Sequence, residues 1–334
     1  MSELRLQPSE VHALITGALV RSRTSERNAA SVADALVEAE LAGQGGHGLR
    51  RVAAYAAQAR AGKVDGFAEP TVERPRPAVL AVDAANGFAF PALDLAFEPL
   101  SDSARSQGIA IAGFRRSHHC GVAGVTVERY ARSGLLALMF ANSPAAMAPW
   151  GANRPLFGTN PIAFAAPIAG ADPLVVDVSL SKVARGKIMA ANQKGVPIPS
   201  DWAFDAQGQP TTDPKAALAG TMAPLGDAKG TALALMVELL AAGLVGANYA
   251  YEASSFFDDK GSPPGVGQTI ICIDPDAFGG TAVLERFATM ARMVADAPGA
   301  RLPGSRRHAL KQKLLKEGIA VDKSLMAEIE AIAR

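Results

Sequence analysis

Short apolar runs alternate with longer helix-like segments through the middle of the chain, and this alternation restricts the fold more than any other feature. Runs typical of β-strands lie at 79–82, 108–112, 135–141, 162–166, 174–178 and 269–274. Helix-like segments lie at 90–106, 122–133, 230–245, 281–296, 306–317 and 324–333. Aromatic residues make up only 6% of the chain, which disfavours an aromatic-rich all-β core. The sequence therefore predicts an α/β or mixed α+β protein.

The chain before these strands is predicted to be helical. Over residues 8–62, Ser9 is expected to cap a first helix, Thr24 or Ser25 a second, and Gly62 to end a third. We expect three parts: a helical part over 1–75, a mixed sheet part over 76–275, and a helical part over 276–334 that returns to the N-terminal helices. Prolines and glycines recur over 192–228, which predicts a loop-rich insertion of the kind that is usually functional.

Charge and cysteine content exclude several classes of protein. The 33 Lys and Arg balance 32 Asp and Glu, so the surplus of cations that nucleic acid requires is absent. Two distant cysteines exclude a disulfide scaffold and a four-cysteine zinc site. No secretory signal is evident, and we expect a cytoplasmic protein. The apolar run 231–247 is interrupted by Glu238 and is too short to span a membrane, so a buried helix is predicted.

The motif Gly43–Gly48 matches the G-x-G-x-x-G fingerprint of dinucleotide-binding folds. That fingerprint must follow a β-strand, whereas the segment 32–42 is helix-like and acidic. A helix end followed by a turn explains these glycines better. The motif is therefore not expected to bind a dinucleotide in the Rossmann manner.

His47 and the pair His118–His119 are candidate catalytic residues. An imidazole titrates near neutral pH, and Arg51 follows His47 closely enough to bind a substrate carboxylate beside it. A surface or capping histidine remains an alternative for His47. The histidine pair follows a predicted strand and precedes a predicted helix, where free backbone amides can bind phosphate or carboxylate. Adjacent side chains point apart and no second ligand cluster has matching spacing, so no metal is expected.

Other turns carry weaker signals. Cys120 has no evident partner base, which favours a small buried hydrophobe over a nucleophile. Thr159 and Asn160 could face a ligand, although turn geometry alone would favour them. The segment Asp177–Ser179 ends an apolar strand, where ligands of α/β folds collect, and the cations of Arg185–Lys187 follow it. The chain contains neither a G-x-S-x-G elbow nor a P-loop, which argues against a hydrolase.

Taken in order, seven motifs resemble the type 2 malate/L-lactate dehydrogenase family of NAD(P)-dependent oxidoreductases, which includes sulfolactate and ureidoglycolate dehydrogenases and cyclic-imine reductases. The similarity covers nearly the whole chain. The motifs are His47-Gly48-Leu49-Xaa-Arg51, Ser117-His118-His119-Cys120-Gly121, Ala148-Pro149-Trp150-Gly151, Phe157-Gly158-Thr159-Asn160-Pro161, Asp177-Val178-Ser179, Lys229-Gly230 and Arg301-Leu302-Pro303-Gly304-Ser305-Arg306-Arg307.

The resemblance implies a homodimer with a non-Rossmann sheet domain for the nicotinamide cofactor, between helical N- and C-terminal segments. It implies that His47 donates a proton to a small carboxylate substrate, that Arg51 binds the substrate carboxylate, and that Thr159 lies at the substrate. His119 is a second candidate for the proton donor. The cofactor positions carried over are His119, Cys120, Gly121, Val122, Ala123, Asp177, Val178, Ser179, Arg185, Gly186, Lys187, Lys229, Gly304, Ser305, Arg306 and Arg307.

The same resemblance bears on cofactor and substrate. Arg306 and Arg307 could pair with a 2′-phosphate, and the acid common at the position of Ser305 is missing, so NADP(H) is favoured over NAD(H). Lys187 follows the hydroxy-acid members, which act on malate, lactate or sulfolactate. The segment 157–167 is instead similar to the reductases of Δ1-pyrroline-2-carboxylate and Δ1-piperideine-2-carboxylate. Both substrate classes therefore stay open.

One departure concerns the residue before the histidine. Relatives commonly carry a serine there, which can orient the imidazole, whereas this chain has Gly46. The orienting contact must then come from another residue. If it is missing, an inactive ligand-binding dimer is the remaining alternative, and it would bind cofactor without oxidising NADPH.

Overall fold

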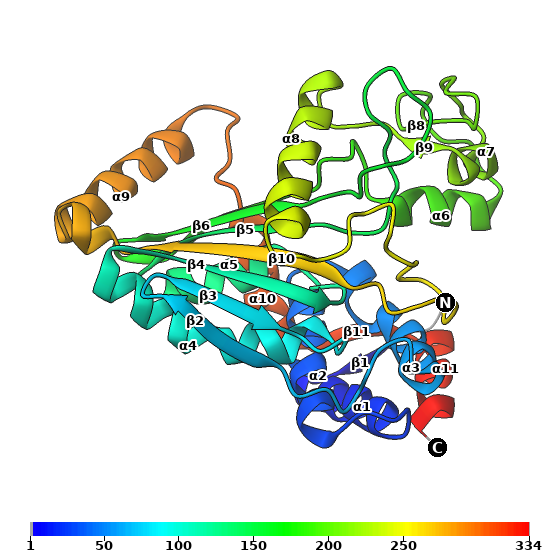
Figure 1. Cartoon of the computed structure of the whole chain (residues 1–334), viewed down its shortest axis with the longest axis horizontal. Helices are drawn as coiled ribbons and strands as arrows, with labels where there is room; N and C mark the ends of the chain where they lie inside the picture. The colour runs from blue at the N-terminus through cyan, green and yellow to red at the C-terminus, as the bar shows by residue number, and fades with distance from the viewer. Residues whose placement is uncertain (1–2, 334) are drawn as a thin grey trace.

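A seven-stranded mixed sheet forms the centre of the computed structural model, which describes residues 3–333 (Figure 1). The strand order is β2-β3-β4-β10-β5-β6-β7, and within it only β3 and β4 pair in parallel. All six predicted strands are present, which confirms the mixed α/β class. The strands are β2 (Thr71–Arg76), β3 (Val79–Asp83), β4 (Ile109–Ser117), β5 (Leu136–Ala141), β6 (Ile162–Ile168), β7 (Ala171–Val178) and β10 (Val266–Ile273).

Outside the loop-rich insertion over 192–228, three strands of the described residues were not expected. Strand β2 falls mostly in the part over 1–75 that was expected to be helical. It lies at the sheet edge and contains Pro75, whose missing N–H is tolerated only at such an edge. The four-residue strands β1 (Glu3–Leu6) and β11 (Ile319–Asp322) pair antiparallel with each other. Runs this short carry no periodic signal, and their pairing joins the two ends of the chain.

The predicted helices are present with small shifts at their ends. Helix α1 begins at Pro8 rather than after Ser9, because Gln7 and Glu10 form a capping box in which the Gln7 N–H donates to the Glu10 carboxylate at 2.6 Å. Ser25 caps α2 as predicted, and Gly62 ends α3 with a φ of 76°. The helices are α1 (Pro8–Val20), α2 (Glu26–Leu41), α3 (Val52–Ala61), α4 (Ala89–Gln107), α5 (Ala123–Arg132), α6 (Arg185–Lys194), α7 (Pro214–Ala219), α8 (Ala228–Glu238), α9 (Thr281–Asp296), α10 (Ser305–Glu317) and α11 (Lys323–Ala333).

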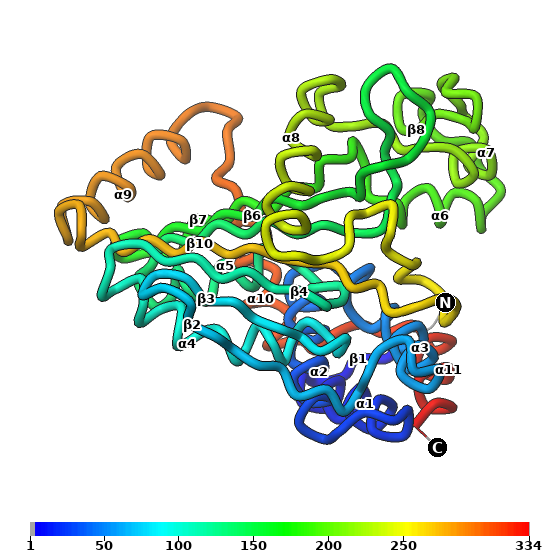
Figure 2. The backbone as a smooth tube through the Cα atoms, viewed as in Figure 1, coloured from blue at the N-terminus to red at the C-terminus, as the bar shows by residue number. Residues whose placement is uncertain are grey.

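The helices form layers on both sides of the sheet. Helices α4 and α5 cover one face, and the N-terminal helices pack at one end of that layer with α11 beside them (Figures 1 and 2). One large core fills this side and includes Phe114, Tyr130 and Met139. A smaller core around Met147, Ile188 and Val237 supports the upper lobe, which contains α6, α7 and α8.

The upper lobe contains the loop-rich insertion predicted over 192–228. Besides α7 it has two short strands, β8 (Ala203–Phe204) and β9 (Thr221–Met222), which pair with each other, so the segment is more regular than expected. Within residues 3–333, no helix is long and apolar enough to cross a membrane.

The prediction of a buried helix over 231–247 is wrong. Helix α8 continues as a π-helical turn over Leu239–Gly243, and Ala234 and Val237 face the core. The opposite face exposes leucines and a methionine, namely Leu233, Leu235, Met236, Leu239 and Leu244. A helix that is apolar on all sides can be fully buried, or it can bury one side and expose the other, and hydrophobicity alone does not distinguish these two cases.

Candidate active site

His47 and Arg51 lie on two consecutive 3₁₀ turns, Gly45–His47 and Leu49–Arg51, between α2 and α3. The Glu40 carboxylate at the end of α2 accepts the N–H of Leu49 at 2.7 Å and so holds the second turn. A Cβ at Gly48 would come within 2.2 Å of that carboxylate, which explains the glycine at this position. Helix α2, and not a strand, leads directly into Gly43–Gly48, so the rejection of a Rossmann fingerprint is confirmed.

His118 and His119 follow the end of β4 and point in different directions, as predicted. His118 Nε2 lies 2.7 Å from Oε1 of Gln58 on α3, while His119 is directed toward His47. Gly121, with a φ of 68°, then turns the chain into α5. The end of β4 thus places His119 beside the 3₁₀ turn that contains His47.

A hydrogen-bonded chain joins three side chains from separate segments. His47 Nδ1 lies 3.1 Å from His119 Nε2, and the two rings stack with centroids 5.1 Å apart and an interplanar angle of 7°. His119 Nδ1 lies 2.5 Å from the hydroxyl of Tyr55, which is on α3. Both ring nitrogens of His119 are therefore engaged, whereas only one nitrogen of His47 is. His119 supplies the orienting contact that Gly46 cannot.

Burial and nearby positive charge keep these imidazoles neutral. Burial first, and then the charge of Arg51, lowers the pKa of His47 to about 4. The same two causes, in the same order, hold the pKa of His119 well below its usual value. Burial raises the pKa of the Tyr55 phenol, which therefore stays protonated. At neutral pH the chain Tyr55–His119–His47 thus carries no net charge.

Arg51 is a largely buried cation with incomplete hydrogen bonding. Its Nε donates to the Gly46 carbonyl at 2.8 Å, and its guanidinium carbon lies 4.7 Å from the ring centroid of Phe257. Among residues 3–333, its buried Nη1 has no hydrogen-bond partner. Burial lowers the pKa of Arg51, but a guanidinium remains charged in proteins. A desolvated, incompletely paired guanidinium beside two histidines is a site for an anionic group.

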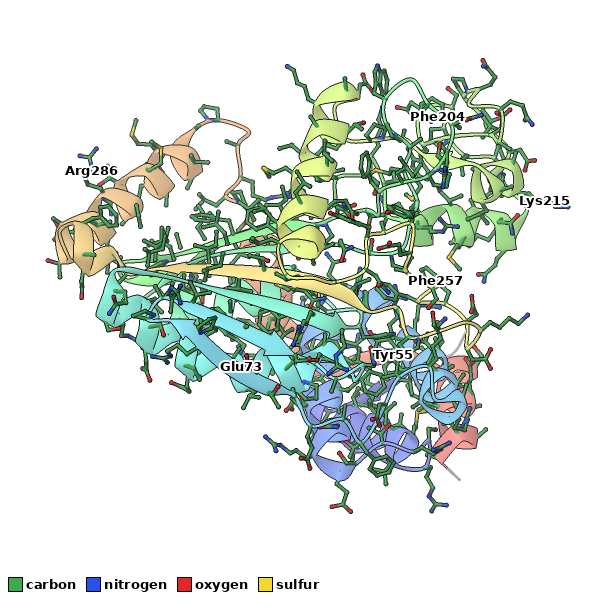
Figure 3. All side chains as sticks on the ribbon, in the orientation of Figure 1. Tyr55, Glu73, Phe204, Lys215, Phe257 and Arg286 are labelled. Carbon is green, nitrogen blue, oxygen red and sulfur yellow. The ribbon has the colours of Figure 1, made fainter. Side chains whose placement is uncertain are left out.

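A loop before β10 closes this site from the other side, where Figure 3 shows Phe257 above Tyr55. Phe256 packs on the rings of His118 and His119, with centroids 5.1 and 5.3 Å away. The buried ammonium of Lys63 anchors the loop by donating to the carbonyls of Ser255 and Asp258 at 2.7 and 2.9 Å. The loop thus places an aromatic wall beside Arg51.

Thr159 belongs to a separate hydrogen-bonded group around a buried carboxylate. Glu238 accepts from Asn160 Nδ2 at 2.8 Å, from the Ala250 N–H at 3.1 Å and from Asn142 at 3.3 Å. These bonds fix the turn in which the Thr159 hydroxyl lies 3.4 Å from that of Ser143. No hydrogen bond within residues 3–333 joins Thr159 to His47 or Arg51 directly, so its role at the substrate stays a prediction.

Several predicted cofactor positions meet where β7 ends beside α5 and α10. The carboxylate of Asp177 accepts the Gly124 N–H at 2.8 Å. Burial raises the pKa of this carboxyl, although that hydrogen bond and the charge of Arg307 act in the opposite direction. A Cβ on Gly304 would lie 3.3 Å from the carbonyl of Val175, which places the 304–307 turn against β7. Arg307 itself pairs with Glu128, whereas Arg306 is exposed with no partner among residues 3–333.

The remaining cations predicted at the cofactor lie in the upper lobe. Arg185 and Lys187 are in the first turn of α6, where Lys187 Nζ lies 5.9 Å from the ring of Trp202. Gly186 lies between them, and Lys229 is exposed in the first turn of α8. Ser179 donates to the carbonyl of Thr159 at 3.3 Å, which links the end of β7 to the predicted substrate turn. Arg306 and Arg307 are therefore on a different element from these three cations.

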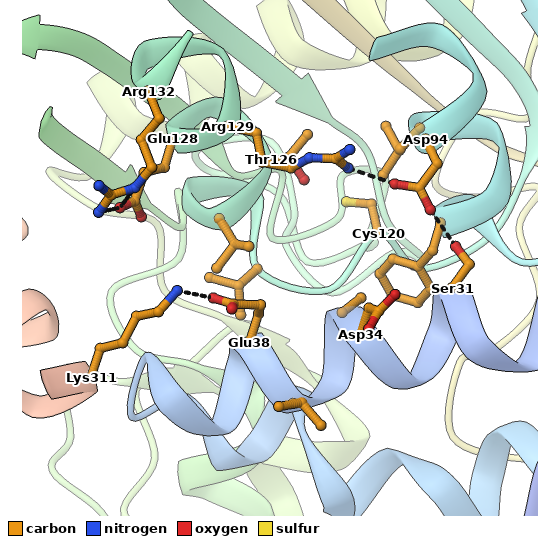
Figure 4. A pocket seen from close by; sticks show the side chains of 16 residues that line it. Ser31, Asp34, Glu38, Asp94, Cys120, Thr126, Glu128, Arg129, Arg132 and Lys311 are labelled. Carbon is orange, nitrogen blue, oxygen red and sulfur yellow. Dashed lines mark hydrogen bonds and ion pairs between the residues drawn. The ribbon is translucent and has the colours of Figure 1, made fainter. Parts of the chain in front are cut away.

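A cavity of about 410 Å³ between α2, α4 and α5 is a different kind of space (Figure 4). Cys120 and Val122 line it, and burial raises the pKa of the Cys120 thiol to about 12, so that thiol is not activated. The charges around it pair with one another, as in Arg129–Asp94, Lys311–Glu38 and Arg132–Glu128. Unlike Arg51, the cations of this cavity already have carboxylate partners, so the cavity is not a candidate site for an anionic ligand.

Within residues 3–333, no group of three or more His, Cys, Asp or Glu side chains is arranged to hold a metal ion.

Comparison with known proteins decides the family. The malate/L-lactate dehydrogenase family matches residues 6–330. The chain belongs to this family. It is 48% identical over 324 residues to a "(2R)-3-sulfolactate dehydrogenase (NADP(+))" of Chromohalobacter salexigens, covering 97% of this chain and 96% of that protein. It is 42% identical over 327 residues to a Δ1-pyrroline-2-carboxylate/Δ1-piperideine-2-carboxylate reductase of Pseudomonas putida, covering 95% and 94%.

Solved structures of this dehydrogenase family share the fold. The Δ1-piperideine-2-carboxylate reductase of Pseudomonas syringae superposes with a TM-score of 0.93 at 37% identity, covering 98% of this chain and 99% of that one. A sulfolactate dehydrogenase of Methanocaldococcus jannaschii superposes with a TM-score of 0.89 at 29% identity, covering 98% and 96%. The chain is therefore an NAD(P)-dependent oxidoreductase of this family, as the seven motifs indicated.

Four residues that position the site were not singled out from the sequence. Tyr55 and Gln58 bind the two histidines, Lys63 anchors the aromatic loop, and Glu238 holds the Thr159 turn. Glu238 did carry a signal, because it is the one acid in a long apolar run, where an isolated carboxylate is retained only if it is hydrogen-bonded. Tyr55 lies one helical turn after Arg51, which places both side chains on one face of α3.

Proposed function

We propose that this dehydrogenase transfers a hydride between NADP(H) and C2 of a small 2-oxo or 2-hydroxy acid of the malate, lactate or sulfolactate type. The observation that carries the proposal is the buried guanidinium of Arg51, with its unpaired Nη1, beside the His47–His119 pair. A 2-oxo acid supplies a carboxylate for Arg51 and, next to it, a carbonyl for an imidazole. The 48% identity to a sulfolactate dehydrogenase supports a 2-hydroxy acid.

The two histidines then have different roles. Both nitrogens of His119 are engaged by Tyr55 and His47, so His119 is a positioning residue. His47 has Nε2 left for the substrate, and a neutral imidazole N–H can polarise a carbonyl and donate its proton. Arg51 fixes the carboxylate so that the carbonyl stays in register with that N–H. Because His47 is half-exposed, the proton that it loses can be replaced from solvent.

The residues at the end of β7 fit the cofactor. Asp177 is solvent-accessible although one carboxylate oxygen is bound to Gly124, so its other oxygen can accept a ribose hydroxyl. The adjoining 304–307 turn offers Arg306 as a free guanidinium for a phosphate. When bound, NADPH would supply the hydride. We infer that Arg306 selects NADP(H) over NAD(H), which accords with the NADP(+) in the name of the sulfolactate dehydrogenase relative.

We also propose a homodimer that works in the cytoplasm. A single chain exposes the apolar face of α8, and α9 adds exposed Met290 and Met293 on the same side of the sheet (Figure 1). Large apolar side chains exposed together on the face of a helix mark protein interfaces. A second copy of the chain is the occupant that accounts for both helices. Light scattering should give a dimer mass, which Leu239→Glu together with Leu244→Glu should shift toward the monomer.

A second candidate function is reduction of cyclic 2-imino acids. It is favoured by the aromatic wall, since Phe257 packs directly against Arg51 and would accept an apolar ring better than a second anionic group. Relatives at 42% identity carry that activity in their names. In this reaction Arg51 would bind the carboxylate in the same way, and His47 would act at the imine nitrogen.

A substrate panel separates the candidates. Loss of NADPH absorbance is followed with pyruvate, oxaloacetate, 3-sulfopyruvate, Δ1-pyrroline-2-carboxylate and Δ1-piperideine-2-carboxylate, and then with NADH in place of NADPH. The proposal expects a 2-oxo acid to give the highest kcat/KM. A higher value for the imines would establish the second function instead. Cofactor binding without turnover of any substrate would support the inactive dimer and refute both.

A further inference from the structure

We propose that Tyr55 is a positioning residue that sets the tautomers of both histidines, so that His47 presents an N–H rather than a lone pair to the substrate. The inference rests on the proposed function, because it concerns how the same site holds its proton. It goes beyond that function by giving a defined role to a buried phenol that contacts neither substrate nor cofactor in the proposal.

The first step is the surroundings of the Tyr55 hydroxyl. Tyr55 is fully buried, and its ring packs against Phe88 and His118 with centroids 5.3 and 5.4 Å away. Within residues 3–333, His119 Nδ1 at 2.5 Å is the one hydrogen-bond partner of the hydroxyl. The hydroxyl therefore has a single hydrogen-bond partner within the described residues and lies beside aromatic rings.

The second step is the direction of that hydrogen bond. If the phenol donates, its proton is bound and the lone pair of His119 Nδ1 is satisfied. If it accepted an N–H from His119, its own proton would be buried without an acceptor, which costs free energy. The phenol therefore donates, and the proton of neutral His119 must be on Nε2.

The third step carries this choice to His47. Nε2–H of His119 faces His47 Nδ1 at 3.1 Å, so it donates and His47 Nδ1 accepts. Neutral His47 then keeps its own proton on Nε2. The alternative arrangement, with both histidines protonated on Nδ1, turns every hydrogen bond around and leaves a lone pair on His47 Nε2. That form could accept a proton but could not donate one to a carbonyl oxygen.

As a consequence, the Tyr55 hydroxyl determines which ring nitrogen of His47 carries the proton, although the two side chains are linked through His119. Without it, His119 Nδ1 has no partner in either tautomer, and the bias between the two arrangements is lost. An enzyme with the wrong histidine tautomer retains its geometry but loses much of its rate. If the two arrangements become equally populated, about half of the molecules present the N–H, so loss of the bias alone is expected to reduce kcat for reduction by about twofold, with little change in KM because Arg51 is unaffected.

The experiment compares Tyr55→Phe with Tyr130→Phe. Tyr130 is a matched control, since it is equally buried and, among residues 3–333, its hydroxyl has no partner. The readouts are kcat and KM on the best substrate of the panel, and the ¹⁵N shifts of the histidine side chains in the cofactor-free protein. We expect the wild type and Tyr130→Phe to show His119 and His47 protonated on Nε2, and Tyr55→Phe to show a mixture with lower kcat.

The experiment distinguishes failure of the tautomer proposal from failure of the proposed enzymatic function. Wild-type protein that turns over no substrate refutes the function, while its ¹⁵N spectrum still tests the tautomers. A wild-type spectrum with His119 protonated on Nδ1 overturns the inference even if Tyr55→Phe fails to fold. A folded Tyr55→Phe variant with wild-type kcat and unchanged shifts also overturns it. Equal loss of kcat in Tyr130→Phe would show a packing effect and count against the proposal.

Discussion

Arg51→Met should abolish most activity while leaving the fold nearly as stable as before. Methionine keeps much of the side-chain length but removes the charge and every donor. A carboxylate bound by a guanidinium through charge-assisted hydrogen bonds in a desolvated site is worth about 3–5 kcal/mol. Each 1.4 kcal/mol corresponds to about a factor of ten, so kcat/KM should fall by about two to three and a half orders of magnitude.

The effect of the same substitution on unfolding follows from the contacts of Arg51. The variant loses the bond to the Gly46 carbonyl and the contact with Phe257, together worth about 2 kcal/mol. It also removes the buried Nη1 that lacks a partner, whose desolvation costs about 1–3 kcal/mol in the substrate-free protein. The two contributions nearly cancel, and the melting temperature should stay within about 4 °C.

Steady-state kinetics and thermal unfolding of Arg51→Met test both halves, with Arg51→Lys as the control that keeps the charge but loses bidentate geometry. Arg51→Lys should lie between wild type and Arg51→Met in kcat/KM. A kcat/KM within threefold of wild type for Arg51→Met would refute the substrate role. A melting temperature lowered by about 10 °C or more would show that Arg51 is a structural residue.

Three further predictions follow from the buried and exposed charges. Burial lowers the pKa of His118 to about 3, below its unfolded value of 6.5, so the stability from this group is fully present above pH 6.5 and is lost as the pH falls toward 3. Chemical denaturation should show about 2–3 kcal/mol less stability from this group at pH 4.5 than at pH 7. The substitution His118→Phe should remove that part of the pH dependence. Glu238→Ala leaves the donors of Asn160 and Ala250 unsatisfied and should lower the free energy of unfolding by about 3 kcal/mol, measured by denaturant titration, whereas a change below 1 kcal/mol would contradict the role of this carboxylate. Arg306→Ala should weaken NADPH binding about tenfold or more by fluorescence titration and leave NADH binding unchanged, and equal weakening of both cofactors would argue against a 2′-phosphate contact.

The sequence predicted the sheet and its helices better than the ends of the chain. The six expected strands are apolar runs, each with buried residues, so their composition marks them in the sequence. Strand β2 escaped because Pro75 is acceptable only at an edge, and edge position is a property of the assembled sheet. The prediction that the helix over 231–247 is buried was wrong because the sequence of an apolar helix does not show which of its faces the folded chain exposes.

The site was predicted from motifs but could not be assembled from them. His47, Arg51 and His119 were candidates because each residue type suits the chemistry, yet the contact between His47 and His119 spans 72 residues and depends on how β4 ends beside α3. The distinction between the two histidines came only from Tyr55, which occupies the second nitrogen of His119. Gly46 removed an expected orienting hydroxyl, and the stacked His119 ring takes that place.

The most direct test of the account is transfer of deuterium to the product from NADPH in which both hydrogens of nicotinamide C4 are replaced by deuterium. Labelled cofactor, wild-type protein and the best 2-oxo acid of the panel are combined, and the product is analysed by NMR and mass spectrometry. The account predicts a 2-hydroxy acid with deuterium on C2, and product formation should nearly vanish in His47→Ala. Product without deuterium on C2, or full turnover by His47→Ala, would contradict it.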